Sequence, residues 1–421
     1  MVKKQYIPRI ADKTLERMLH TTGAVHIIGP KGCGKSTTAA RKCKTEYLLQ
    51  DPENESLRML ASTKPSELFK SAKPILLDEW GEVPGLWDAV RVEVDREGEM
   101  GEFILTGSSV PKEDGYKHSG VDRIAPMTMR TMSLFESGDS SGSVSLGSLF
   151  DGNKAVSGKS PHALEDIAFL TVRGGWPRSV RIDREYAQDV VMNYYNATIG
   201  IDVFKVDGKK KNIEAVDRLM RSYARNISTM ASMKTIISDV ISSDKLVSQS
   251  TVEEYVDSLA RLFIVEDVPA WSPEVRSKTA IRTTPKRQLT DPSLAAAALN
   301  INEKRLVKDL NTFGFFFESL CVRDLRVYSE ALRGKVRHYH DAQDLEVDAI
   351  IELRDGRWGA VEIKLGAGDV PQAETNLLAL RNNVVAEGGR EPSFMMVLIA
   401  TGYVSTTPNG VMVVPIDCLG P

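Results

Sequence analysis

Short apolar runs separated by longer polar segments characterise the first quarter of the chain. The runs lie at residues 24–28, 46–49, 74–77 and 102–105. An apolar run of this length, bounded by turn-forming residues, is typical of a strand buried on both faces. The pattern therefore predicts a βαβαβ arrangement, a parallel sheet with helices on both faces.

The middle of the chain has helical periodicity instead. Helices are expected at 165–172, 184–198, 213–227, 233–242 and 250–263, before a strand-like run at 263–268. Three helices followed by a strand and a turn are typical of a winged helix-turn-helix. The Ser- and Gly-rich stretch at 137–161 has little periodicity, which predicts a loop or linker.

The last helix of this predicted module is acidic. Ser250 and Glu253 have the spacing of a capping box, so we expect the helix to begin there. Glu253, Glu254 and Asp257 then lie in its first two turns, where they would repel phosphates. A winged helix that mediates contacts between domains or subunits is therefore favoured over one that reads DNA. The basic run 209–211 indicates a solvated loop, with a phosphate-binding patch as the alternative.

The last part of the chain predicts a helix followed by a β-hairpin. An apolar helical pattern at 314–322 contains one acid, Glu318. Two strand-like runs, 344–353 and 357–364, flank the sequence Arg-Asp-Gly at 354–356. Asp-Gly between two such runs is a hairpin signal.

The segment after the first apolar run is the most informative of the sequence. It reads Gly-Pro-Lys-Gly-Cys-Gly-Lys-Ser, the pattern GxxxxGK[ST] between a predicted strand and a predicted helix. The glycines let successive backbone N–H groups point at phosphate oxygens, and the helix adds its positive end. Lys35 is expected to reach the β- and γ-phosphates and Ser36 to ligate Mg²⁺. The predicted nucleoside triphosphate site consists of Gly29, Pro30, Lys31, Gly32, Cys33, Gly34, Lys35, Ser36 and Thr37.

Acidic and hydroxyl side chains end two later strands. Asp78 and Glu79 follow the apolar run in the manner of a Walker B motif, at the strand end where a nucleotide lies. Asp78 is expected to hold Mg²⁺ and Glu79 to polarise the attacking water. If the next strand lies between the first and third, Thr106 or Ser108 comes near the γ-phosphate. A turn that caps the following helix is the alternative for either residue.

Two arginines follow this strand. Arg123 or Arg130 is a candidate arginine finger that acts in a neighbouring subunit, and Arg123 is counted among the candidate catalytic residues. A surface ion pair is the alternative for both.

These residues resemble prokaryotic AAA-type P-loop ATPases that carry a C-terminal domain of unknown function of the DUF4143 type. The resemblance rests on residues 29–36, 74–80, 103–109 and 123–136, on Val-Arg-Gly-Gly-Trp-Pro at 172–177 and on Pro-Lys-Arg-Gln-Leu-Thr-Asp at 285–291. It implies ATP as the nucleotide. One departure is Ile201-Asp202, where the family often has Arg-Asp, so no role of that arginine is carried over.

The end of the chain also resembles the PD-(D/E)xK nuclease superfamily. Glu318 matches its helix acid, Asp348 its metal aspartate, and Glu362 with Lys364 its ExK pair. The resemblance implies that the three acids hold Mg²⁺ and that Lys364 orients or activates water. A strand edge with salt-bridged acids and lysine is the alternative.

The hairpin turn decides whether these side chains share a face. Glu362 and Lys364 are two residues apart on one strand and therefore point the same way. A two-residue loop would put Asp348 on the opposite face. A three-residue loop with Gly356 left-handed would bring the Cβ atoms of Asp348 and Glu362 to about 5 Å. We predict the three-residue loop, which permits a shared divalent cation.

Composition adds few constraints. With 42% hydrophobic and 26% charged residues over 421 positions, the chain is ordinary for a soluble protein, and its net charge of −3 gives no global basic field. The four cysteines lack ligand spacing, which argues against a disulfide framework or a structural zinc. Since no signal peptide or 18-residue apolar stretch is visible, we expect a cytoplasmic protein without a membrane span.

The predicted fold class is α/β. A P-loop NTPase (AAA-like) parallel-sheet domain is followed by a helical winged-helix module and an α/β nuclease-like domain. The expected boundaries are 1–140 for the ATPase domain, 141–161 for the linker, 162–300 for the helical domain and 301–421 for the nuclease-like domain.

Two functions fit these residues. The first is an ATPase that hydrolyses ATP with Mg²⁺ and couples hydrolysis to a nuclease-like, DNA-directed C-terminal domain. The second is an ATP-switched signalling or scaffold protein whose C-terminal domain is catalytically silent. A winged-helix transcriptional regulator is disfavoured by the acidic helix. ATP is the expected ligand, and DNA, a second copy of the chain and another protein are candidate partners.

Overall fold

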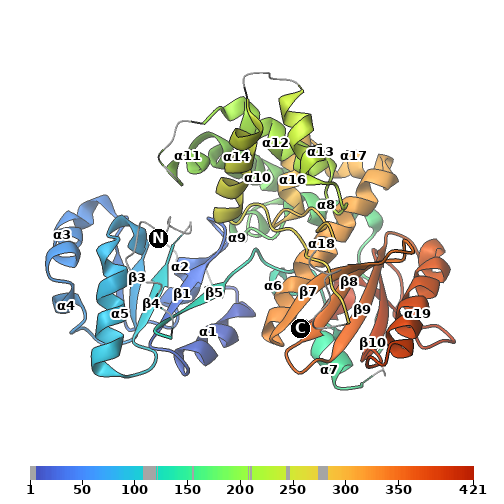
Figure 1. Cartoon of the computed structure of the whole chain (residues 1–421), viewed down its shortest axis with the longest axis horizontal. Coiled ribbons are helices and arrows are strands. Elements are labelled where there is room, and N and C mark those ends of the chain that lie inside the picture. The colour runs from blue at the N-terminus through green and yellow to red at the C-terminus, as the bar shows by residue number, and fades with distance from the viewer. Residues whose placement is uncertain are drawn as a thin grey trace. The chain divides into compact units, whose positions relative to one another are not determined.

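The computed structural model describes residues 6–107, 120, 122–153, 156–206, 208, 211–242, 247–273 and 283–421. Two compact units are present (Figure 1). Unit 1 comprises Met1–Thr131, Asp202–Lys209 and Ser258–Phe263, and unit 2 comprises Met132–Ile201, Lys210–Asp257 and Ile264–Pro421. The predicted α/β class is confirmed, because unit 1 contains a parallel sheet and unit 2 a separate mixed sheet.

A five-stranded parallel sheet forms the centre of unit 1. Its order is β2-β3-β4-β1-β5. The strands are β1 (Ala24–Ile28), β2 (Thr45–Leu48), β3 (Ile75–Asp78), β4 (Phe103–Thr106) and β5 (Ile124–Thr128). The four strands expected from apolar runs are all present. The pattern did not predict β5, an edge strand that tolerates Pro126 because one of its sides needs no ladder hydrogen bonds.

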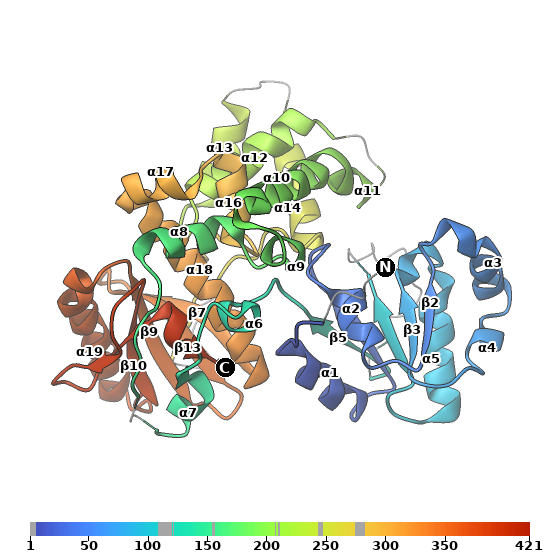
Figure 2. The same cartoon turned by 180° about the vertical axis from the view of Figure 1, so that it is seen from behind.

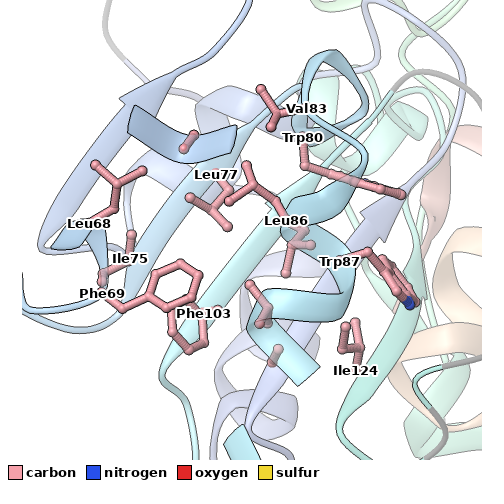
Figure 3. Packing of buried hydrophobic residues seen from close by; sticks show 14 of the residues in the cluster. Leu68, Phe69, Ile75, Leu77, Trp80, Val83, Leu86, Trp87, Phe103 and Ile124 are labelled. Atoms are coloured by element: carbon pink, nitrogen blue, oxygen red, sulfur yellow. The ribbon is translucent and has the colours of Figure 1, made fainter. Parts of the chain in front are cut away.

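Helices cover both faces of this sheet. They are α1 (Ala11–Leu19), α2 (Lys35–Ala40), α3 (Glu55–Thr63), α4 (Pro65–Leu68) and α5 (Gly85–Glu97), and the short α11 (Val203–Lys205) also belongs to this unit. Because strand side chains alternate, Leu76 and Ile104 pack with Leu15 of α1 on one face. Leu77 and Phe103 face the other way, into a cluster that includes residues of α4 and α5 (Figure 3).

A buried histidine lies beside two tryptophans in unit 1. The rings of Trp80 and Trp87 meet the His26 ring edge-on at 5.7 and 5.4 Å. The Trp80 indole N–H donates to His26 Nε2 at 3.0 Å. Burial lowers the pKa of His26 to about 4, and the charge of Lys35 acts in the same direction. His26 is therefore neutral at physiological pH and serves as an acceptor.

Eight helices of the described chain form the helical part of unit 2. They are α8 (Leu164–Arg173), α9 (Pro177–Val180), α10 (Ala187–Ala197), α12 (Ile213–Arg225), α13 (Met233–Ile241), α14 (Gln249–Arg261), α16 (Pro292–Leu299) and α17 (Glu303–Lys308). Of α14, the residues from Ser258 onward belong to unit 1. All five predicted helices are among them. The predicted start of α14 is wrong, because Ser248 rather than Ser250 accepts a hydrogen bond from a first-turn amide, that of Thr251 at 3.2 Å.

The strand expected at 263–268 is reduced to two isolated antiparallel bridges. Val265 pairs with Leu289, and Val268 pairs with Lys286. The segment therefore lies beside the residues of the Pro-Lys…Asp signature rather than in a sheet. Of the basic run, Lys209 and Lys210 lie outside the described residues, whereas Lys211 is buried instead of solvated.

The Ser- and Gly-rich stretch is more ordered than a linker. It contains the end of α6 (Leu134–Ser137), β6 (Val144–Ser145) and α7 (Leu146–Phe150). Strand β6 pairs in parallel with β13 (Leu419–Gly420). The sequence pattern missed this because a two-residue strand has no periodicity and its partner lies far along the chain.

A six-stranded mixed sheet forms the C-terminal part of unit 2, with the order β11-β12-β10-β9-β8-β7. The strands of this sheet are β7 (Gly334–His340), β8 (Glu346–Leu353), β9 (Trp358–Lys364), β10 (Phe394–Ile399), β11 (Ser405–Thr406) and β12 (Met412–Pro415). The helices of this part are α18 (Leu310–Ala331) and α19 (Val370–Ala386). Helix α7 is visible in both views, and β13 is labelled in the view from behind (Figure 2). Across the described residues, no helix is both long and apolar enough to cross a membrane.

Buried charges on α18 bind the two signature segments together. The Asp291 carboxylate accepts from the amide of Gly175 at 2.9 Å and from the guanidinium of Arg323 at 3.2 Å. Arg323 also pairs with Asp324 at 2.7 Å, and Asp324 in turn accepts from the amide of Leu134 at 3.0 Å. All three charged side chains are buried. The signatures at 172–177 and 285–291 are therefore parts of one structural network.

We predict that His26 makes the stability of unit 1 acid-sensitive. Its pKa is lowered in the folded state, so its contribution is complete above pH 6.5 and is lost as the pH falls towards 4. The loss should reach about 3 kcal/mol, because each pKa unit is worth about 1.4 kcal/mol. His26→Gln keeps an acceptor for Trp80 but does not titrate. Calorimetric unfolding between pH 7 and 4 should give a shallower decline for His26→Gln, and equal declines would contradict this account.

Candidate functional site

The loop between β1 and α2 requires glycine at three positions. Gly29, Gly32 and Gly34 have φ of 147°, 77° and 110°, which other residues rarely adopt. At Gly29 a Cβ would lie 2.0 Å from the carbonyl oxygen of Met129. The glycines of the predicted phosphate loop are therefore required by its backbone conformation.

Lys35 lies inside this loop. Its side chain is buried, and Nζ donates to the carbonyl oxygens of Gly29 at 2.8 Å and Pro30 at 3.0 Å. Both partners are neutral. A phosphate oxygen carries charge and is a stronger acceptor for an ammonium group than a carbonyl oxygen is. Lys35 can therefore exchange these bonds for bonds to a nucleotide.

Arg9 supports the same loop, and sequence reasoning missed it. Its guanidinium is 7% exposed and donates to the carbonyl oxygens of Cys33 and Arg130, both at 2.8 Å. These partners are backbone atoms 24 and 121 residues away, so no local pattern marks Arg9. Lys31, also in the loop, is exposed and pairs with Asp202 at 3.1 Å.

The expected strand order is confirmed. Strand β4 lies between β1 and β3, and Thr106 is level with Asp78 on β3 and with Ile27 on β1. The Thr106 hydroxyl donates to the Asp78 carboxylate and accepts from the amide of Glu79 at 3.3 Å. One hydroxyl thus positions both acids at the strand ends next to the phosphate loop.

Glu79 is in a strained conformation. Its φ of 52° and ψ of 53° are left-handed, which is uncommon for a non-glycine residue and costs about 1–3 kcal/mol. Such strain is often found at functional sites. Asp78 beside it is 1% exposed and accepts from Gln50 Nε2 at 3.3 Å through its second oxygen.

The donor set at this edge fits magnesium. Mg²⁺ prefers a few protein oxygens together with phosphate oxygens and water. The Ser36 hydroxyl at the start of α2 and the Asp78 carboxylate at the end of β3 supply oxygens of this kind. Thr37 is exposed on α2, and Ser108 lies outside the described residues.

The two arginines lie at opposite ends of strand β5. Arg123 precedes β5, next to the start of β1, and pairs with Asp95 at 2.6 Å. Arg130 follows the end of β5, where the amide of Met129 donates to the carbonyl oxygen of Ile28 at 2.7 Å. Within one chain, the structure therefore brings Arg130, and not Arg123, to the edge that carries the phosphate loop.

The hairpin of unit 2 has the predicted turn. Gly356 has a φ of 80°, and Leu353 donates to the carbonyl oxygen of Arg357, which leaves three residues in the loop. Ala349 pairs with Val361, so that Asp348 is level with Glu362. The three-residue loop is confirmed, and the two carboxylates share a face.

Lys364 binds both carboxylates. Its Nζ lies 2.6 Å from Glu362 Oε2 and 3.3 Å from Asp348 Oδ2. The amide of Ile363 donates to the same Asp348 oxygen at 2.9 Å, and Asn376 donates to Glu362 Oε1 at 3.0 Å. Asp348, Glu362 and Lys364 therefore lie together, and Glu318 is joined to Asp348 through the lysine described next.

A second lysine, Lys286, occupies this region. Its Nζ lies 2.9 Å from Glu318 Oε1, 2.7 Å from Glu346 Oε1 and 2.9 Å from Asp348 Oδ1, and the residue is 1% exposed. We call Glu318, Glu346, Asp348 and Glu362 the carboxylate cluster. Sequence reasoning noted Lys286 only as part of a signature, because its partners lie 32 or more residues away.

The two ammonium groups divide the cluster electrostatically. Burial raises the pKa of Glu318 to about 8, and burial with the charge of Asp348 raises the pKa of Glu362 to about 8. Burial would also raise the pKa of Asp348, but Lys286 and Lys364 hold it well below its usual range. Asp348 is therefore the ionised acid to which both lysines bind.

A divalent cation does not fit this arrangement. Among the residues that the structure describes, no group of three or more His, Cys, Asp or Glu side chains is disposed to hold a metal ion. The oxygens that would bind a cation at Glu318 and Asp348 are instead bound by Lys286. The expected metal site of Glu318, Asp348 and Glu362 thus has a lysine where the cation was predicted.

Three family models match parts of the sequence. An AAA domain matches residues 21–137, a domain of unknown function, DUF8612, matches 164–305, and a second, DUF4143, matches 313–419. The chain joins an AAA-type P-loop ATPase domain to a DUF4143 domain. The predicted combination of an AAA-type P-loop ATPase domain with a DUF4143 domain is therefore confirmed, while the two signatures at 172–177 and 285–291 lie in the part that DUF8612 matches. No curated protein matches the sequence.

Solved structures resemble this chain at low identity. The Walker-type ATPase PABY2304 of Pyrococcus abyssi is 12% identical with a TM-score of 0.43, over 70% of this chain and 97% of its own. AMPPCP-bound DnaA from Aquifex aeolicus is 14% identical with a TM-score of 0.29, over 60% and 86%. Drosophila ORC bound to DNA is 12% identical with a TM-score of 0.23, over 69% and 94%.

We predict that Arg9→Met weakens nucleotide binding roughly tenfold, about 1.4 kcal/mol. The change removes two charge-assisted hydrogen bonds to carbonyl oxygens and leaves the loop carbonyl of Cys33 without its buried donor. Titration with a fluorescent ATP analogue measures the effect. Arg96→Met, on the exposed side of α5, is the matched control. Wild-type affinity in a folded Arg9→Met protein would contradict the supporting role.

Proposed function

We propose that the AAA domain binds ATP together with Mg²⁺ and hydrolyses it. The observation that carries this proposal is the position of Thr106 on the strand between β1 and β3. From there its hydroxyl contacts the Asp78 carboxylate and the Glu79 amide beside the phosphate loop. Asp78 serves binding of the metal, whereas Glu79, whose amide the same hydroxyl accepts from, is the acid that hydrolysis needs in addition.

Each side chain has a distinct proposed role. The loop amides and Lys35 bind the phosphates, and Ser36 with Asp78 holds the metal. Mg²⁺ neutralises charge on the β- and γ-phosphates when it is bound. Glu79 orients and polarises water for attack, and its strained backbone fixes where the carboxylate can point.

We further propose that the DUF4143 domain is a catalytically silent part of an ATP-switched signalling or scaffold protein. The alternative, a metal-dependent nuclease, is favoured by Asp348 lying level with Glu362 and by Lys364 beside them. It is opposed by Lys286, which binds the oxygens that such a metal would need. Regulation by ATP would then act through binding of a partner rather than through cleavage of DNA.

We predict that two substitutions separate binding from turnover. Lys35→Ala should abolish nucleotide binding, because it removes the buried ammonium group that lies among the loop carbonyls. Glu79→Gln should keep binding while lowering the rate of hydrolysis by at least about 100-fold, since the amide cannot act as a base. Nucleotide titration and phosphate release measure the two effects.

The matched control is Glu82→Gln, an exposed glutamate three residues further on. It should bind and hydrolyse ATP as wild type does. A Glu79→Gln protein with the wild-type rate of hydrolysis would show that the acid is wrongly assigned, even if Lys35→Ala behaves as expected.

We predict that the full-length protein does not cut DNA. Single-stranded, duplex and branched DNA would be incubated with Mg²⁺ or Mn²⁺, with and without ATP. Wild type, Asp348→Ala and Lys35→Ala would be compared on gels. Cleavage by wild type that disappears in Asp348→Ala would establish the nuclease instead, and its loss in Lys35→Ala would show that ATP gates it.

A further inference from the structure

The ammonium group of Lys286 has the surroundings that a bound cation would have. One oxygen from each of three acids, Glu318, Glu346 and Asp348, lies within 2.9 Å of Nζ. A lysine ammonium has three donors and no acceptor. Two of these contacts, to Glu318 and Asp348, are hydrogen bonds, and the third, to Glu346, is an ion pair. Carboxylate oxygens therefore lie against the ammonium group from three acids.

Burial makes this pairing obligatory. Lys286 is 1% exposed, and Asp348 and Glu318 are 7% and 8% exposed. Removing one partner from a buried ion pair leaves an uncompensated charge, which is strongly unfavourable. The buried, ionised Asp348 thus needs a cation at this place, and the chain provides its own in Lys286.

The backbone fixes Lys286 where it is. Its amide donates to the carbonyl oxygen of Val268 at 3.0 Å, and the amide of Val268 donates back at 2.9 Å. The neighbouring Arg287 pairs with Asp267. A long side chain that reached in from solvent could leave readily, whereas Lys286 is held by its own main chain on both sides of the bridge.

We propose that Lys286 is the built-in cation of the carboxylate cluster, in the place of a divalent metal. The cluster clamps the segment that contains residues 283–291 onto the DUF4143 domain. Replacing Lys286 with a neutral side chain converts the cluster into a site for one divalent cation. This inference does not depend on ATP hydrolysis, so either can fail without the other.

Binding of Mn²⁺ to the full chain without nucleotide tests the proposal. All proteins would carry Ser36→Ala, which removes the hydroxyl ligand of the nucleotide site. Electron paramagnetic resonance counts the bound ion directly. We expect the protein with Lys286 intact to show no Mn²⁺ site that depends on Asp348. The Lys286→Met variant should gain one Mn²⁺ site. Adding Asp348→Asn to Lys286→Met should abolish the gain.

Lys364→Met is the matched control. Lys364 also binds Asp348, and its replacement leaves Lys286 in place. It should gain no Mn²⁺ site. Lys286→Arg keeps the positive charge and should likewise gain none. Melting temperatures give a second measurement: Lys286→Met should melt lower than the Lys286 protein, and Mn²⁺ should raise its melting temperature selectively.

Two results would overturn the proposal. One is a Mn²⁺ site in the protein with Lys286 intact that Asp348→Asn removes, since a metal would then already reach the cluster. The other is a folded Lys286→Met protein that binds no additional Mn²⁺. If Lys286→Met does not fold, the comparison of the Lys286 protein with Asp348→Asn still decides the first point.

Discussion

The pairing of charges along α18 is the constraint on which unit 2 depends. This helix passes through the interior with Glu318, Arg323 and Asp324 buried on it. A buried charge without a partner costs several kcal/mol, so each of these groups must find one. The partners come from two segments that are far apart in the sequence: Leu134 at the start of α6, and Lys286 with Asp291 in the signature at 285–291. The charges of one helix thus hold both segments against it.

This constraint also accounts for buried polar residues in the two signature segments of the middle region. Asp291 is occupied by Gly175 and Arg323, and Trp176 of the same signature donates to Ser293 at 3.0 Å. These contacts join the two signature segments to each other and to α18. Their role is to specify one packing, and a substitution there would be felt as lost stability.

Two buried lysines show that the same side chain can have a ligand-binding or a structural role. Lys35 lies among neutral carbonyl oxygens of its own loop, so that a charged phosphate is a better partner than those it has. Lys286 lies among carboxylates and has no better partner to gain. The environment, and not the residue type, makes one lysine available to a ligand and commits the other to the fold.

The features that could be predicted from the sequence are those fixed over short distances along the chain. The phosphate loop follows from its glycines, and the level of Asp348 with Glu362 follows from counting residues around Gly356. Arg9 and Lys286 could not be placed, because each acts through atoms brought near only by the fold.

Strand β6 shows the same limit on prediction, and its pairing with β13 has a consequence for how the chain is made. The hydroxyl of Ser140 reaches the carbonyl oxygen of Leu419, 279 residues later. A ribosome synthesises the chain from its N-terminus, and the N-terminal domains generally fold first. The parallel sheet of unit 1 is complete once β5 has emerged, whereas unit 2 can close only when residues 419–420 are free. During synthesis the parallel sheet of unit 1 is therefore complete for a time while unit 2 is still incompletely folded.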